Sequence, residues 1–321
     1  MRQQSEKSGS PIRIATRASR LATWQADYTA QLLRRHSPGC EVELVQISTS
    51  GDRDRTTVLS GFGGIGVFTR EIQNAVLDGR ADLAVHSLKD LPTEPHDTLT
   101  LAAIPQRAST FDALVLPENA QTDAGLDALP HAARVGTGSL RRRAQLLSHR
   151  DDLQLCEVRG NIETRLRKLD DGEYDALILA AAGLQRLGLE SRISLELCPP
   201  LMYPAVGQGA LGIECRADNA ELRAMLKQLD DPATRFAVTA ERRLLARLRA
   251  GCHAPVGALT SIQADQLQLE AIVLSTDGRQ RLTASAVLNA DKAEMLGEQV
   301  ADDLLAQGAA ALINPDNPTP E

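Results

Sequence analysis

The stretch DGRADLAV at residues 78–85 has a counterpart at residues 171–178, which read DGEYDALI. In each, a glycine ends a helical pattern and an apolar run of strand length follows. A second pair of segments, RIATRASRLATWQ (13–25) and RVGTGSLRRRAQLL (134–147), shares a strand, a turn with Thr or Ser, and a helix. Strands that alternate with helices form mainly parallel sheets. The two pairs of similar segments therefore predict two similar α/β lobes.

The last third of the chain has a different pattern. A long helical run covers residues 220–251, with a break expected around Asp231-Pro232, and alternating polar and apolar residues follow over 259–290. The pair Asp277-Gly278 in the alternating part is typical of a β-hairpin turn. One final helix is expected over 292–313. Together these elements predict a third, smaller α+β domain.

Length and composition limit the classes of protein that fit. A chain of 321 residues is long enough for two or three compact domains. The net charge of −7 and the aromatic content of 2% argue against a nucleic-acid partner. Residues 1–17 contain no apolar run typical of a secretion signal, and no segment is long enough to span a membrane. We therefore expect a cytoplasmic protein.

Five cysteines are dispersed along the chain without a C-x-x-C pair: Cys40, Cys156, Cys198, Cys215 and Cys252. Dispersed cysteines without a secretion signal indicate reduced thiols and no metal site. Cys252 differs from the rest because Gly251 before it and Pro255 after it favour an exposed turn. The pattern is compatible with either an inert thiol or a reactive one.

Basic residues are concentrated between positions 134 and 168, which hold nine arginines or lysines against four acidic residues. A solvated helix face would explain this charge. The segment GTGSLRRR within it favours an anion site instead, because hydroxyls and backbone N–H groups gather at a helix start. Carboxylates would suit such a site, since guanidinium groups bind them with two parallel hydrogen bonds.

The motif VHSLKDLP, residues 85–92, places Lys89 and Asp90 directly after an apolar strand. Ligands of open α/β sheets collect at the carboxyl ends of strands. The two residues are either a structural ion pair, or a cation for a substrate carboxylate beside an acid that stabilises positive charge. The segment GFGGIG at 61–66 has the spacing of a dinucleotide motif but no clear strand before it, so a movable lid explains it equally well.

These segments, taken in order, resemble the porphobilinogen deaminase family, also called hydroxymethylbilane synthases. The matching parts are RIATRASRLATWQ, GDRD, ADLAVHSLKDLPT, VGTGSLRRRAQL, VRGNIETRLRKLDDGEYDALILAAAGLQRLGL, PAVGQGALGIECR and GCHAPVG. The resemblance implies an α/β fold of two periplasmic-binding-protein-like (type II) lobes with a smaller C-terminal α+β domain. The expected boundaries are 1–105 with 205–225 for domain 1, 106–204 for the arginine-rich domain 2, and 226–321 for domain 3.

Enzymes of this family are transferases of heme and porphyrin biosynthesis. They join four porphobilinogen molecules head to tail, release ammonia at each addition, and give the linear tetrapyrrole hydroxymethylbilane. The resemblance implies a covalent dipyrromethane cofactor on which the product grows. It also implies a small-molecule substrate, no nucleic acid, no membrane, no metal and a monomer.

Two residues acquire chemical roles from the resemblance. Cys252 matches the thioether attachment point of the cofactor, and Asp90 matches the catalytic carboxylate. The residues that match cofactor or substrate ligands are Arg17, Ser19, Ser87 and Lys89 in the first lobe, with Thr137, Ser139, Arg141, Arg142, Arg159, Arg165 and Arg186 in the second.

The sequence departs from the family pattern at four positions. Gly61, Ile65 and Phe111 stand where relatives often carry basic residues, and Gly138 stands where serine is commoner. These departures concern substrate affinity and the lid. Two other classes stay open: a two-lobed solute-binding protein, which would need a secretion signal but no reactive cysteine, and a slowed or inactive relative that still holds the cofactor.

Overall fold

The computed structural model describes residues 10–48, 69–118, 120, 125–251 and 254–314. They form two compact units, each assembled from segments that are far apart in the sequence. Unit 1 contains the described residues up to 91, then 95–106 and 211–231; unit 2 contains 92–94, 107–210 and those from 232 onward.

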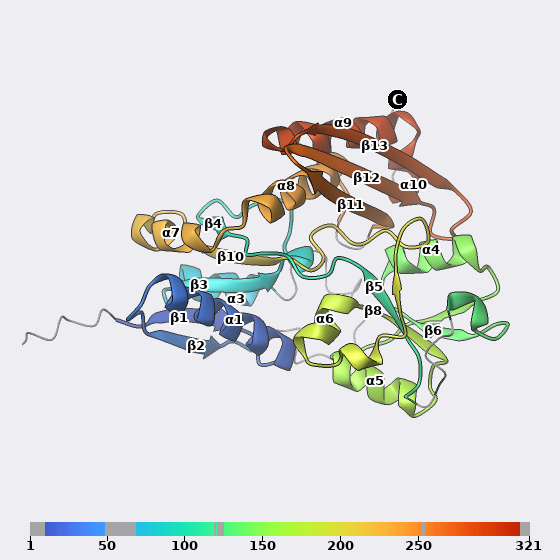
Figure 1. The fold of residues 1–321 in the computed structure, drawn as a ribbon, viewed down its shortest axis with the longest axis horizontal. Helices are drawn as coiled ribbons and strands as arrows, with labels where there is room; N and C mark the ends of the chain where they lie inside the picture. Colours follow the sequence, from blue (N-terminus) through green and yellow to red (C-terminus); the bar gives the residue numbers. More distant parts are fainter. Residues whose placement is uncertain (1–9, 49–68, 119, 121–124, 252–253, 315–321) are drawn as a thin grey trace, which may run out of the picture. The chain divides into compact units, whose positions relative to one another are not determined.

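Unit 1 is built on a five-stranded sheet (Figure 1). Its elements are β1 Ile12–Thr16, α1 Arg20–His36, β2 Val42–Gln46, α3 Arg70–Leu77, β3 Leu83–Ser87, the 3-10 turn η2 Leu88–Asp90, β4 Leu99–Ala103, β10 Leu211–Arg216, α7 Ala220–Leu226 and η5 Lys227–Leu229. The strand order is β2-β1-β3-β10-β4. β1 is parallel to β2 and β3, whereas β10 is antiparallel to β3 and β4.

The spacing of apolar residues produces the layers of unit 1. Ala26, Ala30 and Leu33 lie on one face of α1 and belong to the same buried cluster as Leu83 of β3. Since side chains alternate along a strand, the next residue, Ala84, belongs to the cluster of α3 on the opposite face. Helices therefore cover both faces of the sheet, as expected for an α/β lobe.

Unit 2 contains a second five-stranded sheet, with the order β7-β6-β8-β5-β9. Its elements are β5 Asp112–Val115, η3 Leu126–Ala128, β6 Arg134–Gly136, α4 Leu140–His149, β7 Gln154–Cys156, α5 Ile162–Asp170, β8 Ala176–Ala180, α6 Ala181–Arg186, η4 Glu190–Arg192 and β9 Leu195–Leu197. β6 is parallel to β7 and β8, and β5 is antiparallel to β8 and β9. The arrangement repeats that of the first sheet, with β5 in the place of β10.

One ion pair occurs in the same place in both sheets. The backbone N of Arg13 in β1 donates to Oδ2 of Asp82 over 2.8 Å, and Nη2 lies 2.8 Å from Oδ1. The backbone N of Arg134 in β6 donates to Oδ2 of Asp175 over 2.7 Å, and Nη2 lies 2.9 Å from Oδ1. Both aspartates come from the echoed segments at 78–85 and 171–178, so the prediction of two similar α/β lobes is confirmed.

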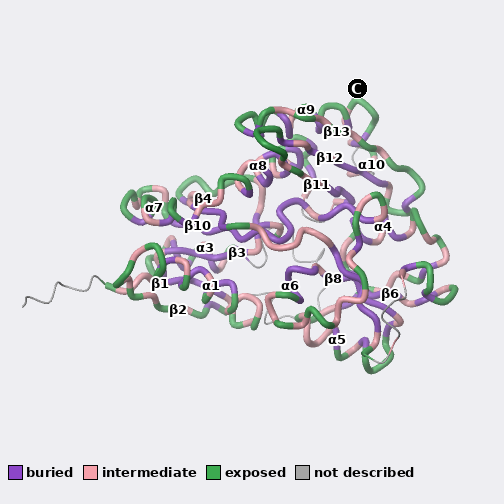
Figure 2. Tube along the Cα trace, viewed as in Figure 1, coloured by how far each residue is buried: buried purple, intermediate pink, exposed green. Residues whose placement is uncertain are grey.

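A third sheet, also within unit 2, has three antiparallel strands in the order β11-β12-β13. Its elements are α8 Pro232–Arg247, β11 Val256–Gln263, β12 Gln266–Leu274, β13 Arg281–Asn289, η6 Ala290–Lys292, α9 Ala293–Ala306 and α10 Ala309–Ile313. Helices and sheet share one buried cluster, so the predicted smaller C-terminal α+β domain is confirmed. Figure 2 shows buried residues in β11 and β12, whereas the residues of β13 are intermediate or exposed.

Two glycine turns in the C-terminal α+β domain can be compared with the predicted hairpin and the predicted final helix. Gly278 has a φ of +74° between β12 and β13, which agrees with the predicted hairpin. The single final helix expected over 292–313 is wrong, because Gly308 adopts a φ of +96° and separates α9 from α10. Among the described residues, no helix is both long and apolar enough to cross a membrane.

Candidate active site

The first candidate region is the turn that follows β3 in unit 1. Leu88 is 1% exposed and Leu91 is 5% exposed, so the two leucines anchor this turn. Between them, Lys89 is half-buried and Asp90 is exposed. Within the described part of the chain, the Asp90 carboxylate has no hydrogen bond or ion pair. An open carboxylate therefore lies at the carboxyl end of a strand, where ligands of α/β sheets collect.

Ser87, the last residue of β3, is held from α1. Its Oγ accepts a hydrogen bond from Nε2 of Gln25 over 2.8 Å, and Gln25 is only 4% exposed. Gln25 is a residue that the sequence analysis did not single out, although it falls in the matching segment 13–25. The contact fixes the Ser87 hydroxyl directly before the Asp90 turn.

Arg17 and Ser19 connect β1 to α1. Arg17 is half-buried, and Ser19 is the N-cap of α1, where its Oγ accepts a hydrogen bond from the backbone N of Ala22 over 3.3 Å. β1 and β3 are neighbouring parallel strands. The five first-lobe candidates therefore come together at one edge of the first sheet.

In unit 2, the start of α4 forms the second candidate region. Thr137 is 1% exposed, and its Oγ1 accepts a hydrogen bond from the backbone N of Ser139 over 3.3 Å. Ser139 is the N-cap of α4 but its side chain makes no capping hydrogen bond, and the first turn has no acidic residue. A hydroxyl and the positive end of a helix dipole are thus available to an anion.

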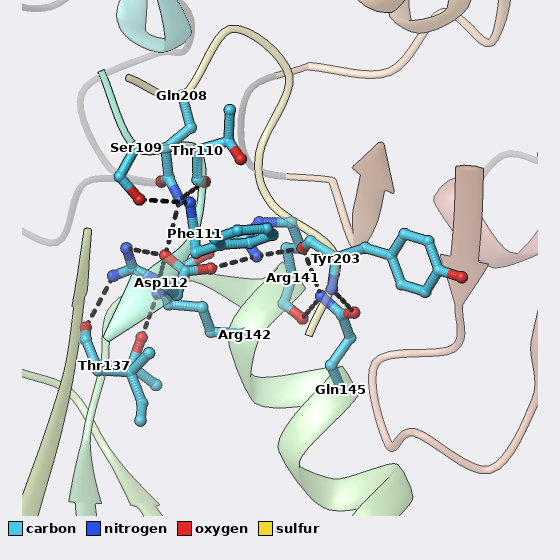
Figure 3. A network of polar contacts seen from close by, with 12 residues as sticks. Ser109, Thr110, Phe111, Asp112, Thr137, Arg141, Arg142, Gln145, Tyr203 and Gln208 are labelled. Atoms are coloured by element: carbon cyan, nitrogen blue, oxygen red, sulfur yellow. Dashed lines mark hydrogen bonds and ion pairs between the residues drawn. The ribbon is translucent and has the colours of Figure 1, made fainter. Parts of the chain in front are cut away.

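Two arginines of α4 turn inward onto a buried aspartate (Figure 3). Oδ2 of Asp112 lies 2.7 Å from Nη1 of Arg141, and Oδ1 lies 2.7 Å from Nη2 of Arg142. Asp112 is fully buried, and the arginine side chains are only 5% and 9% exposed. Burial alone would raise the pKa of Asp112, but the two guanidinium groups hold that pKa well below its usual value.

The remaining donors of these arginines also bind the protein itself. Nη1 of Arg142 donates to the backbone O of Ile178 over 2.8 Å, and Nη1 of Arg141 donates to the backbone O of Tyr203 over 2.6 Å. Gln145, one turn further along α4, accepts from the backbone N of Tyr203 over 2.7 Å. Arg141 and Arg142 thus hold the lobe together, and their role as carboxylate ligands stays a prediction.

Three further arginines of the arginine-rich lobe lie outside this buried network. Nη2 of Arg159 is 2.6 Å from Oε1 of Glu157, and Nε of Arg165 donates to the backbone O of Gly160 over 2.8 Å. Nη2 of Arg186 donates to the backbone O of Gly209 over 2.6 Å. All three arginine residues are half-buried.

Several predictions concern residues outside the described part of the chain. Cys252 is one of them, as are Gly61 and Ile65 of the glycine-rich segment. Phe111 is described: it is half-buried, and its backbone N donates to Oγ of Ser109 over 3.3 Å. Among the residues with described positions, no cluster of three or more His, Cys, Asp or Glu side chains could hold a metal ion.

The sequence analysis missed Asp112 and Gln208. Nε2 of Gln208 donates to Oδ1 of Asp112 over 3.0 Å and to the backbone O of Thr110 over 2.8 Å. Gln208 is fully buried. The signal for Asp112 was present in the segment DALVL, because a charge at the start of an apolar strand requires a buried partner.

Comparison with known proteins identifies the family. Residues 12–224 match the family model described as "Porphobilinogen deaminase, dipyromethane cofactor binding domain", and residues 235–306 match "Porphobilinogen deaminase, C-terminal domain". The chain is 48% identical over 302 residues to the porphobilinogen deaminase of Xanthomonas axonopodis pv. citri (strain 306), covering 94% of this chain and 98% of the relative. It is 48% identical over 303 residues to that of Stenotrophomonas maltophilia (strain R551-3), covering 94% and 99%.

The likeness to solved structures is much weaker. The periplasmic VFT2 domain of Bordetella pertussis BvgS is 14% identical, with a TM-score of 0.41, over 68% of this chain and 86% of that domain. The sulfonate-binding protein SsuA from Methylobacillus flagellatus KT is 17% identical, with a TM-score of 0.39, over 74% and 68%. The family matches confirm the resemblance seen in the sequence segments. The chain belongs to the porphobilinogen deaminase family, the transferases that polymerise porphobilinogen into hydroxymethylbilane.

Proposed function

We propose that this chain builds hydroxymethylbilane on a dipyrromethane group that is bound to Cys252 through a thioether. The observation that carries the proposal is the match of residues 12–224 to a dipyrromethane cofactor binding domain. The cysteine in question follows α8 and precedes β11, in the segment GCHAPVG that resembles the family's attachment site. The bound group would supply the terminal pyrrole ring to which each porphobilinogen is added.

The donor groups of unit 2 fit a ligand that bears several carboxylates. The Ser139 hydroxyl makes no capping hydrogen bond at a helix start without acidic residues, and the same lobe carries half-buried arginines. We therefore assign the binding of acetate and propionate side chains to the second-lobe set Thr137, Ser139, Arg141, Arg142, Arg159, Arg165 and Arg186. In the first lobe, we assign the binding of acetate and propionate side chains to Arg17, Ser19, Ser87 and Lys89.

Asp90 is assigned the catalytic role. Loss of ammonia from porphobilinogen leaves a positively charged pyrrole, and the next carbon–carbon bond forms when a second ring attacks it and then releases a proton. The exposed Asp90 carboxylate, without a partner among the described residues, is available to stabilise that positive charge. An aspartate already paired with arginine, such as Asp112, would be much less able to do so.

The boundaries of the three domains, a cytoplasmic location and a monomeric state also belong to this proposal. The two family matches, which separate residues 12–224 from 235–306, support a distinct C-terminal domain. Size-exclusion chromatography with light scattering measures the oligomeric state, and a dimer mass would contradict the monomer.

The decisive experiment is the intact mass of the denatured protein, followed by peptide mapping. We expect a mass excess equal to two porphobilinogen molecules less two ammonias, located on the peptide that contains Cys252. The Cys252→Ser variant should lack the adduct, whereas the control Cys198→Ser, which removes an exposed free thiol, should keep it. An adduct on another cysteine would refute the attachment site.

The same samples separate an active enzyme from a slowed relative. Loaded protein that releases hydroxymethylbilane from porphobilinogen supports the whole proposal. Loaded protein without turnover would indicate an inactive relative, and an unmodified chain, even after incubation with porphobilinogen or hydroxymethylbilane, would indicate a binding protein.

A further inference from the structure

A buried polar cluster lies behind the Asp90 turn, within unit 1. Nε2 of His86 in β3 lies 3.1 Å from Oε2 of Glu214 in β10, and the side chains are 4% and 6% exposed. Gln73 of α3 donates from Nε2 to the same Oε2 over 2.9 Å. Three elements of the lobe, two strands and a helix, thus meet at one carboxylate oxygen.

The face of the first sheet that carries this cluster also holds a buried apolar cluster. On this face of the sheet, the buried residues packed between β3 and α3 include Ala84, Ile72 and Val76. A carboxylate and an imidazole are costly to place in such a core, because both lose hydration that only well-placed partners replace. Aliphatic side chains of similar size would pack there without that cost. The cluster therefore has a use other than stability.

The position of His86 indicates that use. His86 lies opposite Gly212 of β10 in the sheet, and its chain neighbour Ser87 is held by Gln25 from the other face. The turn residue Leu88 occupies the space that the missing side chain of Gly212 leaves, since a Cβ there would lie 2.9 Å from Cδ1 of Leu88. Polar contacts on both faces and one close packing contact therefore fix the last turn of chain before Asp90.

We propose that His86, Glu214 and Gln73 form a positioning anchor that fixes the end of β3 and thereby aims the Asp90 carboxylate. None of the three is a catalytic residue. His86 acts through the backbone of β3, and Glu214 and Gln73 act by holding the His86 side chain. The inference rests on the role of Asp90 proposed above. It predicts that loosening the anchor lowers kcat without weakening the carboxylate contacts of unit 2, so KM should stay unchanged.

The test compares three variants of the full chain, each checked for adduct mass and melting temperature. His86→Leu leaves the Glu214 carboxylate buried with one partner fewer, so it should melt earlier and turn over slowly. His86→Leu combined with Glu214→Gln removes the buried charge, and this double variant should regain stability. His86→Gln places an amide N–H within reach of Glu214 and should restore most of kcat.

The kcat of the double variant distinguishes a positioning role of the anchor from a purely structural one. A misplaced catalytic group costs up to roughly 100-fold in rate, so we expect kcat to fall about 10- to 100-fold in stable, cofactor-loaded protein with unchanged KM. Wild-type kcat in the double variant would overturn the anchor. Equal loss of kcat in His86→Gln would overturn it as well, because the restored donor would then be irrelevant.

Two controls separate this inference from the proposed function. His96→Gln changes an exposed histidine beyond the turn, whose Nδ1 accepts a hydrogen bond from the backbone N of Thr98, and it should leave kcat and KM unchanged. Asp90→Asn measured in parallel should abolish most turnover. If Asp90→Asn is inactive while the double variant is fully active, the proposed role of Asp90 survives and only the anchor is refuted. An active Asp90→Asn variant refutes both.

Discussion

Asp90 lies in the turn that follows β3 and Asp112 is the first residue of β5, and the surroundings of these two aspartates are opposite. Asp112 is fully buried and contacts two guanidinium groups. Asp90 is exposed, and no partner for it occurs among the residues with described positions. A carboxylate whose charge is neutralised by buried arginines stabilises the lobe around it. An exposed carboxylate without a charged partner among the described residues remains available to a ligand.

The same contrast exists between the two sheets as a whole. They share strand order and an Arg–Asp pair in the same place. They differ in their acids: the first lobe has an open acid in the turn after β3, and the second buries an acid under two arginines at the start of β5, opposite the last residue of β8. The two lobes therefore share a frame of strands but carry different charges at corresponding places.

The largest effect on stability is expected at the buried carboxylate. Asp112→Asn leaves Arg141 and Arg142 buried without a counter-charge, so the free energy of unfolding should fall by about 3–5 kcal/mol. Urea denaturation of the variant measures it. The control Asp218→Asn breaks a pair that is 47% and 67% exposed, and it should cost about 0–1 kcal/mol. Equal losses would show that burial is not the cause.

The open carboxylate should behave in the reverse way. Asp90→Asn should reduce kcat roughly 100- to 1,000-fold, the range for losing one electrostatic stabiliser of a transition state, with the adduct mass retained. Its free energy of unfolding should change by less than about 0.5 kcal/mol, since no described contact is lost. Asp97→Asn, another exposed aspartate in the following loop, should have wild-type activity. Turnover that persists in Asp90→Asn would remove it from the mechanism.

Acid titration sharpens the comparison further. The pKa of Asp112 is lowered in the folded protein, so its contribution to stability is present above the unfolded pKa of about 3.9 and is lost as the pH falls below that value. Wild type should therefore lose up to about 1.4 kcal/mol per pH unit more than Asp112→Asn between pH 4 and 2.5. Thermal melts across this range measure the difference. If the stability of wild type and of Asp112→Asn changes with pH in the same way, the pKa of Asp112 is not lowered in the folded protein.

The smallest effects are expected where the two lobes are alike. Asp82→Asn and Asp175→Asn each break a half-exposed pair with an arginine, so each should cost about 0–1 kcal/mol. The two losses should be similar, because each aspartate accepts the same three hydrogen bonds from its arginine. A clear difference between them in urea denaturation would mean that the repeated pair is retained for different reasons in each lobe.

Much of the fold could be predicted because it depends on local patterns. Helix and strand periods, the Asp277-Gly278 hairpin and the echo of 78–85 at 171–178 all lie within short windows of sequence. The break between α9 and α10 at Gly308 was not predicted. A glycine near the end of a helical pattern can either lie within the helix or end it, and the sequence does not distinguish the two.

The candidate site could be predicted less completely. Asp90 could be singled out because it follows an apolar strand, and its catalytic role stays a prediction. Asp112 was missed because its arginine partners lie about 30 positions away in another element, and only the fold brings them together. The His86 and Glu214 contact joins residues that are still further apart, so no spacing rule indicates it.

The return of β10 to the first sheet has a consequence for synthesis of the chain on the ribosome. β10 lies between β3 and β4, so until residue 216 has emerged these two strands lack the partner that joins them. The second sheet, by contrast, is complete with residues 112–197. The arginine-rich lobe can therefore fold first, and the strand that leads to Asp90 gains its final neighbour only after that lobe has been made.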